Sequence, residues 1–367
     1  MTTLFDPLRI GDFVAANRIM MAPLTRDRSG PAGVPLPMAA TYYGQRATAG
    51  LIITEGTQIS AEGQGYLDTP GIYTPDQIAS WRRVTDAVHE KGGKIAVQLW
   101  HVGRISHVSL LPKGIIPVSS SARPADAKTF TKEGFVQVSP PRALTTAEIP
   151  RVIADFRRAA RCAMDAGFDA VEVHGAHGYL VEQFLRDSIN DRSDEYGGTL
   201  ANRVRFGVEV MSAIVEEIGA GRTGIRLSPV SPVNDTGQDS NSQVAYEQTV
   251  TALARLKLAF IHVVEGWTGV DRDSVKFDYE SLRKRFKAGN ETGAWIVNNR
   301  FSGTMAEEFV ERGSADAVAF GKPFISNPDL VRRLKEGAPL TPTIEATMYG
   351  GGAEGYIDYP TMDGSPA

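Results

Sequence analysis

Short apolar runs alternate with longer amphipathic segments along the whole chain. Eight of these runs lack the polar alternation of half-exposed strands, as is typical of parallel strands that are covered by helices. They cover residues 18–23, 50–55, 94–100, 170–174, 223–227, 260–265, 294–298 and 317–321. The pattern therefore predicts eight buried strands of a parallel sheet.

Helical spacing characterises the segments between these runs. They cover residues 37–49, 75–91, 146–166, 200–218, 242–257, 279–287, 302–312 and 328–336. In the third, Val152, Phe156 and Ala159 fall on one face, and Thr199 precedes the fourth as a candidate N-cap. Eight strand–helix units over 367 residues favour an α/β fold of the (β/α)8 TIM barrel type over a doubly wound sheet. No linker divides the chain, so we expect one domain over residues 1–367.

Two regions exceed a minimal barrel. Residues 101–145 contain several prolines and an alternating segment at 135–138, which predicts a long excursion after the third strand with a β-hairpin. Residues 338–367 form a tail rich in glycine and proline, in which Gly350, Gly352 and Gly355 formally match G-x-G-x-x-G. No strand precedes this match, so we reject a dinucleotide-binding role and expect an irregular segment.

Composition excludes several classes of function. The chain has 39 basic and 43 acidic residues, a net charge of −4, which gives no electrostatic case for binding nucleic acid or an anionic membrane. The start of the chain does not resemble a signal peptide and no run is as long as a membrane helix, so we expect a cytoplasmic protein. The single cysteine, Cys162, excludes an internal disulfide and a cysteine-ligated cluster and is expected to pack in the core. Redox chemistry would therefore need an organic cofactor or a metal.

Polar residues follow the predicted strands, and in a barrel these strand ends meet at one mouth. The fourth strand ends at His174, with His177 and Tyr179 close behind it. Two imidazoles at this spacing can converge on one oxygen, and a tyrosine with a pKa of about 10 can supply a proton. The arrangement indicates polarisation of a carbonyl-like oxygen and protonation of a neighbouring carbon. From the histidines alone, a role in binding backbone groups is equally favoured.

Other strand ends suit an anionic cofactor. Gln98 and Arg226 end two strands, and Gly321 with Lys322 begins a short helix after the last one. Backbone N–H groups approach a phosphate closely at glycine, and a lysine adds charge, although Lys322 fits a solvated surface position equally well.

A metal site is the main alternative from residue types. His174 and His177 can share a metal with Glu172, which lies on the same strand face. The remaining strand ends supply mostly hydrogen-bond donors, so a metal centre is disfavoured.

Taken together, these residues resemble the Old Yellow Enzyme family of flavin-dependent ene-reductases over essentially the whole chain. The motifs that carry the resemblance are APLTR at 22–26, QLWH at 98–101, HGAHGY at 174–179, DEYGG at 194–198, FGK at 320–322 and NPDL at 327–330. Within the family the chain looks most similar to a bacterial branch that includes glycerol trinitrate reductase and N-ethylmaleimide reductase.

The resemblance implies a noncovalent FMN at the mouth of the barrel and NADPH, or NADH, as reductant. It implies that the flavin is bound by Pro23, Leu24, Thr25, Gly56, Gln98 and Arg226, and its phosphate by Asn299, Arg300, Gly321 and Lys322. Tyr66, Trp100, Tyr349, His174 and His177 are implied to contact the substrate. Many family members have arginine at the position of Lys322, which supplies a point charge instead of a bidentate fork.

The implied reaction is ping-pong reduction of activated C=C bonds in enones, maleimides and nitroalkenes, with nitrate esters as a further candidate substrate. Hydride comes from flavin N5, and Tyr179 donates the proton. The partners would be small electrophiles and NAD(P)H, with no nucleic acid and no membrane, in a monomer or homodimer. Three alternatives stay open: a metal-dependent hydrolase, a flavin-binding protein without catalysis, and a flavin reductase that passes electrons to oxygen or a quinone.

Overall fold

Eight parallel strands form a closed barrel in the computed structural model, which describes residues 2–268, 270 and 272–364. Each of the predicted apolar runs overlaps one of these strands, so the predicted TIM barrel is confirmed. In order around the barrel they are β3 (Ile19–Met21), β4 (Leu51–Gln58), β5 (Ile95–Trp100), β10 (Ala170–Gly175), β11 (Thr223–Leu227), β12 (Phe260–Val264), β13 (Ala294–Asn298) and β14 (Ala317–Phe320).

The helices follow the predicted amphipathic segments. They are α1 (Met38–Gln45), α2 (Pro75–His89), α3 (Ile149–Asp165), α5 (Leu200–Ile218), α6 (Ser242–Ala254), α7 (Tyr279–Gly289), α8 (Gly303–Glu311) and α10 (Leu330–Glu336). The side chain of Thr199 caps α5 by accepting a hydrogen bond from the backbone N–H of Asn202, as predicted. Within the described residues, no helix combines the length and apolar character needed to cross a membrane.

Two short helices begin at the mouth of the barrel. One is α9 (Lys322–Ser326), the short helix expected after the last strand. The other is α4 (Leu180–Leu185), which the pattern did not predict because it is too short to display helical periodicity. Short 3-10 turns complete the described helices at Pro31–Gly33, Ala61–Gly63, Thr146–Glu148, Ala220–Arg222, Arg272–Ser274 and Glu345–Thr347.

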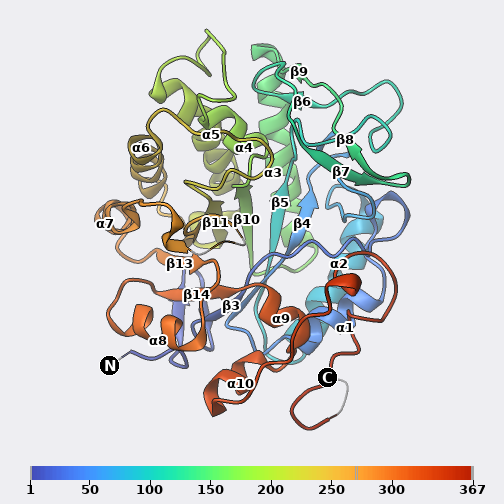
Figure 1. Cartoon of the computed structure of the whole chain (residues 1–367), viewed down its shortest axis with the longest axis vertical. Helices are drawn as coiled ribbons and strands as arrows, with labels where there is room; N and C mark the ends of the chain where they lie inside the picture. Colours follow the sequence, from blue (N-terminus) through green and yellow to red (C-terminus); the bar gives the residue numbers. More distant parts are fainter. Residues whose placement is uncertain (1, 269, 271, 365–367) are drawn as a thin grey trace.

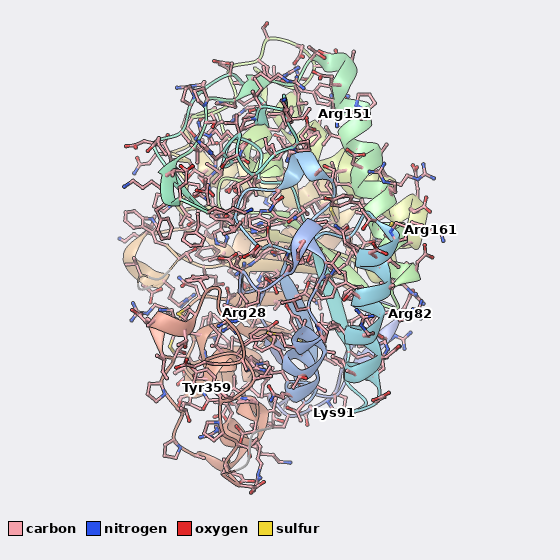
Figure 2. The ribbon with its side chains drawn as sticks, turned by 90° about the vertical axis from the view of Figure 1, so that its right-hand side faces the viewer. Arg28, Arg82, Lys91, Arg151, Arg161 and Tyr359 are labelled. Atoms are coloured by element: carbon pink, nitrogen blue, oxygen red, sulfur yellow. The ribbon has the colours of Figure 1, made fainter. Side chains whose placement is uncertain are left out.

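The larger apolar core lies between the barrel and its surrounding helices. On α3, Phe156 and Ala159 are buried against it, and Cys162 is buried beside them, as expected for a small core residue. Figure 2 shows this helix at the outer edge of the molecule, with Arg151 near its start and Arg161 further along. The amphipathic pattern of the sequence therefore corresponds directly to one buried and one exposed face.

A second, smaller core fills the amino-terminal end of the barrel interior. It consists of inward-facing side chains that include Met20, Ile53, Phe260 and Ile296. Two antiparallel strands that precede the barrel, β1 (Leu8–Ile10) and β2 (Phe13–Ala15), contribute Ile10, Phe13 and Ala15 to the same cluster. This hairpin closes the end of the barrel that lies opposite the predicted site, and we call this apolar cluster the floor.

The predicted excursion leaves β5 and covers residues 101–145. It contains the expected antiparallel hairpin, formed by β7 (Lys128–Thr131) and β8 (Gly134–Gln137). It also contains a parallel pair of β6 (Val118–Ser119) with β9 (Arg142–Ala143), which the sequence did not predict. In Figure 1 these strands lie at the upper right, far from the N-terminus at the lower left.

The glycine-rich tail is irregular, as expected, but two arginines anchor it. Arg26 donates to the carbonyl oxygens of Met348 (2.9 Å) and Gly355 (2.7 Å). Arg28 donates to the carbonyl oxygens of residues 347, 348, 352 and 354. These bonds attach residues 347–355 to the loop after β3 and so hold Tyr349 at the mouth.

Candidate active site

A cavity of about 440 Å³ opens at the carboxyl ends of the barrel strands. Its lining includes all but one of the predicted site residues: Pro23, Leu24, Thr25, Gly56, Gln98, Trp100, His174, His177, Tyr179, Arg226, Asn299, Arg300, Gly321, Lys322 and Tyr349. In the described part of the chain, Tyr66 lies outside this lining. The strand ends therefore meet at one place, as the barrel prediction requires.

His174 ends β10 with its ring buried beside the rings of His177 and Tyr179. The His174 ring centroid lies 5.5 Å from the ring centroid of His177 and 4.8 Å from that of Tyr179. Its Nδ1 accepts a hydrogen bond from the backbone N–H of Ala176 at 3.3 Å, which leaves the proton of a neutral ring on Nε2. Burial lowers the pKa of His174 well below its ordinary value, and the charges of His177 and Arg226 lower it further. The imidazole is therefore a neutral donor.

His177 belongs to a tight turn with a left-handed backbone, φ 57°. Its backbone N–H donates to Ser228 Oγ at 2.8 Å, and its Nε2 lies 2.9 Å from Thr268 Oγ1. Burial also lowers the pKa of His177 well below the ordinary value, so both imidazoles are neutral near pH 7.

Tyr179 faces the two histidines, and its hydroxyl is 3.0 Å from the hydroxyl of Tyr66. Burial raises the pKa of Tyr179, against the opposing hydrogen bonds of Tyr66 and Asn234, so the phenol keeps its proton at neutral pH. Trp100 packs edge-on against Tyr179 and stacks on Tyr66. Tyr66 thus contacts the predicted proton donor without lining the described cavity.

On β11, next to His174 of β10, Arg226 places a buried cation in the cavity wall. Arg226 Nη2 donates to Asn298 Oδ1 at 2.7 Å, whereas Arg226 Nε is buried without a partner in the described part of the chain. Burial lowers the pKa of Arg226 to about 10, with Glu172 opposing this effect, so the guanidinium stays charged at neutral pH. An unpaired buried N–H is costly and fits a bound acceptor.

Glu172 was the candidate third ligand of a metal site, and its two oxygens have other partners. Oε1 accepts from Gln98 Nε2 at 2.8 Å, and Oε2 is 2.8 Å from His262 Nδ1. This buried chain fixes the orientation of the Gln98 amide. Among the described residues, no group of three or more His, Cys, Asp and Glu side chains is placed to hold a metal ion.

The turn after β13 has an unusual backbone. Asn299 and Arg300 both have positive φ, 110° and 53°, which is costly for residues other than glycine. Asn299 stabilises the turn by donating from its side chain to the carbonyl oxygens of Glu265 and Trp267. Lys322 lies nearby at the start of α9, where its ammonium is largely exposed and lies 3.1 Å from Glu345 Oε1.

The loops after β11 and β12 also contribute residues that sequence reasoning missed, among them Val233 and Thr268. Phe301 and Met348 complete the apolar part of the wall. None of these four follows a strand directly or belongs to a periodic pattern, so the sequence carried no signal for them. Trp267, the neighbour of Thr268 in the chain, is 37% exposed and lies outside the described cavity lining.

Residues 3–341 match the NADH:flavin oxidoreductase / NADH oxidase family. The chain belongs to this family. Putative 12-oxophytodienoate reductase 2 of Oryza sativa subsp. japonica is 44% identical over 365 residues, which cover 98% of this chain and 94% of the relative. Flavin oxidoreductase hxnT of Emericella nidulans is 42% identical over 381 residues, which cover 97% of each chain.

Solved structures agree with this assignment. Morphinone reductase in complex with tetrahydroNAD superposes with a TM-score of 0.92 at 42% identity and covers 99% of this chain and 98% of its own. The Old Yellow Enzyme homologue from Zymomonas mobilis gives a TM-score of 0.93 at 42% identity, with coverage of 98% and 99%. The chain is therefore an FMN-dependent ene-reductase of the Old Yellow Enzyme family that uses NAD(P)H. These relatives do not test the bacterial branch, which stays a prediction.

Proposed function

We propose that the chain reduces the activated C=C bond of small enones, maleimides and nitroalkenes, with NADPH as the preferred reductant and FMN held noncovalently. One observation carries the proposal. Two neutral imidazoles and a protonated phenol line one side of the cavity, where the His174 Nε2–H is available as a donor. This set suits a substrate with an electron-withdrawing oxygen next to a carbon that must gain a proton.

The described lining fits FMN. When bound, FMN supplies hydride transfer, taking hydride from NAD(P)H and delivering it to the substrate. Arg226 offers its unpaired Nε to an anionic flavin edge, and the amide of Gln98 is oriented by Glu172 for the pyrimidine ring. Gly56 leaves room for the Trp100 side chain in the same cavity wall, because a Cβ there would stand 2.4 Å from it. Pro23, Leu24 and Thr25 would complete the flavin contacts from the loop after β3.

The phosphate of FMN would be bound mainly by backbone groups. The turn of Asn299 and Arg300 and the start of α9 at Gly321 and Lys322 lie in the same cavity wall. Folding already fixes the backbone N–H groups of these residues, so binding the phosphate costs them no conformational entropy. The exposed Lys322 side chain, in contrast, would have to be ordered when the phosphate binds.

His174 and His177 would donate hydrogen bonds to the carbonyl or nitro oxygen of the substrate. Because both rings are neutral, each brings one N–H without the cost of a buried charge. A well-placed donor to a developing oxyanion is worth about 2.7–4 kcal/mol in other enzymes. Trp100 and Tyr349 would shape the pocket around the rest of the substrate.

Tyr179 would donate its proton to the substrate carbon next to the activating group. Its raised pKa keeps the phenol protonated, and the hydrogen bond with Tyr66 fixes where the hydroxyl lies. General-acid catalysis of this kind contributes about 10²–10⁴-fold.

The direct test is an anaerobic titration of the purified protein. We expect a yellow protein that NADPH bleaches faster than NADH does, and that 2-cyclohexenone, N-ethylmaleimide or a nitroalkene restores to yellow with formation of the saturated product. A nitrate ester tested in parallel decides the further candidate substrate. A yellow protein that neither nucleotide bleaches, or one that only oxygen or a quinone reoxidises, would rule out the proposal.

A further inference from the structure

The turn that joins β10 to α4 places both His177 and Tyr179. His177 has φ 57° and Gly178 has φ 74°, so two successive residues adopt the left-handed region. Gly178 is also tightly enclosed, since a Cβ there would lie 2.6 Å from Thr236 Cγ2 and 2.9 Å from the carbonyl oxygen of Val233. A non-glycine residue at positive φ persists only where the surroundings hold it.

Side chains from other parts of the chain bind every backbone polar group of His177 and Gly178. Two bind His177: its N–H donates to Ser228 Oγ (2.8 Å) and its carbonyl accepts from Asn234 Nδ2 (2.8 Å). Two bind Gly178: its N–H donates to Glu182 Oε2 (2.6 Å) and its carbonyl accepts from Gln183 Nε2 (2.7 Å). The orientation of the turn therefore depends on side chains outside it.

Glu182 is the one member of this set with a charge. The residue is 1% exposed, and its Oε1 accepts from Arg186 Nη2 at 2.7 Å and from Arg186 Nε at 3.1 Å. The hydroxyl of Tyr246 also donates to Oε1. Arg186, which donates twice to this one oxygen, compensates a carboxylate that would otherwise be buried alone.

Ser228 connects the same carboxylate to His177. Its Oγ lies 3.4 Å from each oxygen of Glu182. Ser228 Oγ accepts from the His177 N–H through a lone pair, so its own proton is free to point to Glu182. Glu182 thus acts on Gly178 directly and on His177 through Ser228.

We propose that Glu182, held in place by Arg186, is a positioning residue that fixes the directions of His177 and Tyr179 towards the substrate. The inference rests on the proposed roles of these two residues. A buried ion pair that serves stability alone would produce a different result, because its loss would lower the unfolding temperature without changing the reaction of folded enzyme. Misplacement of a reacting group by about 1 Å can cost as much as 10²-fold in rate.

The test is Glu182→Gln, which keeps the size of the side chain and removes its charge. At saturating 2-cyclohexenone, we expect the reoxidation rate constant of the NADPH-reduced holoenzyme to fall by about 10-fold or more. The solvent deuterium isotope effect on that step is expected to rise, because a displaced Tyr179 makes proton transfer limiting. Flavin reduction by NADPH, which needs no proton from Tyr179, should change less.

Asp329→Asn is the matched control. Asp329 forms an i,i+4 pair with Arg333 at 2.7 Å on α10, and both side chains are largely buried. This substitution should lower the unfolding temperature and leave reoxidation unchanged. If Glu182→Gln behaves in the same way, the positioning role is wrong.

Ser228→Ala provides a second variant in case Glu182→Gln does not fold. It removes only the link to His177, so we expect a smaller decrease of about 3- to 10-fold in reoxidation, and an unchanged rate would overturn the proposal. Tyr179→Phe, measured in parallel, separates the two hypotheses. If Tyr179→Phe reoxidises normally, the proposed proton donor is wrong. If it is slow while Glu182→Gln and Ser228→Ala are normal, only the positioning role is wrong.

Discussion

The two ends of the barrel interior are built on the same strand faces and differ in almost every other respect. On β5 the inward-facing Ala96 of the floor is followed by Gln98, and on β12 Phe260 is followed by His262. Strand β10 runs from Ala170 in the floor through Glu172 to His174 at the cavity. Within two residues along a strand, the interior thus changes from packed hydrocarbon to hydrogen-bonding groups.

This difference separates residues that stabilise the barrel from residues that the chemistry needs. Floor side chains are excluded from water and contribute free energy by burial. At the mouth, buried polar atoms such as Arg226 Nε and His262 Nε2 lack a partner in the described chain, and each unsatisfied group costs about 1–3 kcal/mol. We infer that the floor offsets the cost of a mouth that is arranged for its ligands.

The largest expected effect comes from the floor. Phe260 is fully buried there, and Phe260→Ala should lower the free energy of unfolding by about 3–5 kcal/mol. In the fraction that remains folded, enone reoxidation should be nearly normal, because Phe260 lies outside the described cavity lining. Urea denaturation and stopped-flow measurements on the same samples check both parts. A large decrease in the reoxidation rate of the folded fraction would contradict the separation between floor residues that stabilise the barrel and mouth residues that the chemistry needs.

His174→Ala is the counterpart at the mouth. The loss of one donor to the substrate oxygen should reduce enone reoxidation by about 10²–10³-fold, which corresponds to about 2.7–4 kcal/mol. The unfolding midpoint should hardly change, since within the described residues the His174 ring makes one hydrogen bond, with the backbone N–H of Ala176. A variant that loses stability and keeps its rate would reverse the comparison.

The pH dependence of an Asp27 variant shows whether buried charges near the mouth lower the free energy of unfolding. Burial, together with the nearby Glu55 and Asp68 carboxylates, raises the pKa of Asp27 to about 8. An acid whose folded pKa lies above its unfolded value near 3.9 loses stability as the pH rises towards 8. Asp27→Asn should therefore gain about 1 kcal/mol relative to the parent between pH 7 and 8.5.

Asparagine is a suited replacement because Asp27 has φ 51°, a conformation that asparagine tolerates. Thermal unfolding of both proteins at the two pH values provides the measurement. Parallel pH profiles would show that Asp27 is not the group responsible.

Lys322→Ala should give the smallest effect. Its ammonium is exposed and already paired with Glu345, so it should add only about 0.2–1 kcal/mol to phosphate binding. We expect FMN to bind less than about five-fold more weakly, as measured by fluorescence titration of the apoprotein. Unchanged FMN affinity would exclude Lys322 from the phosphate site. A loss of FMN affinity of about 100-fold would contradict the proposal that backbone N–H groups bind most of the phosphate.

The sequence predicted the barrel and most of the cavity lining because both depend on local patterns. Buried parallel strands are recognisable as apolar runs, and topology alone brings their carboxyl ends together. The motifs at these ends then identified His174, His177 and Tyr179 without a structure. The comparisons with known proteins confirm the family that these motifs indicated, and the role of each single residue stays a prediction.

Contacts between side chains that are far apart in the sequence escaped prediction. The Tyr246 hydroxyl donates to Glu182, His262 Nδ1 contacts the Glu172 carboxylate, and Arg26 donates to the backbone carbonyl of Gly355. The two residues of each pair lie in different segments of the chain and share no periodic pattern. Tyr66 was expected in the substrate pocket and instead contacts Tyr179 outside the cavity lining. Such details depend on how the excursion and loops fold over the mouth, which residue types alone do not determine.

The central claim is that the mouth reduces an activated C=C bond with Tyr179 as proton donor. The most direct measurement is the anaerobic reoxidation rate of NADPH-reduced Tyr179→Phe by saturating 2-cyclohexenone, compared with the parent enzyme. We predict a decrease of at least about 10²-fold, while reduction by NADPH stays within about two-fold of the parent. Reoxidation at the parent rate, or an equal loss in both half-reactions, would contradict the account.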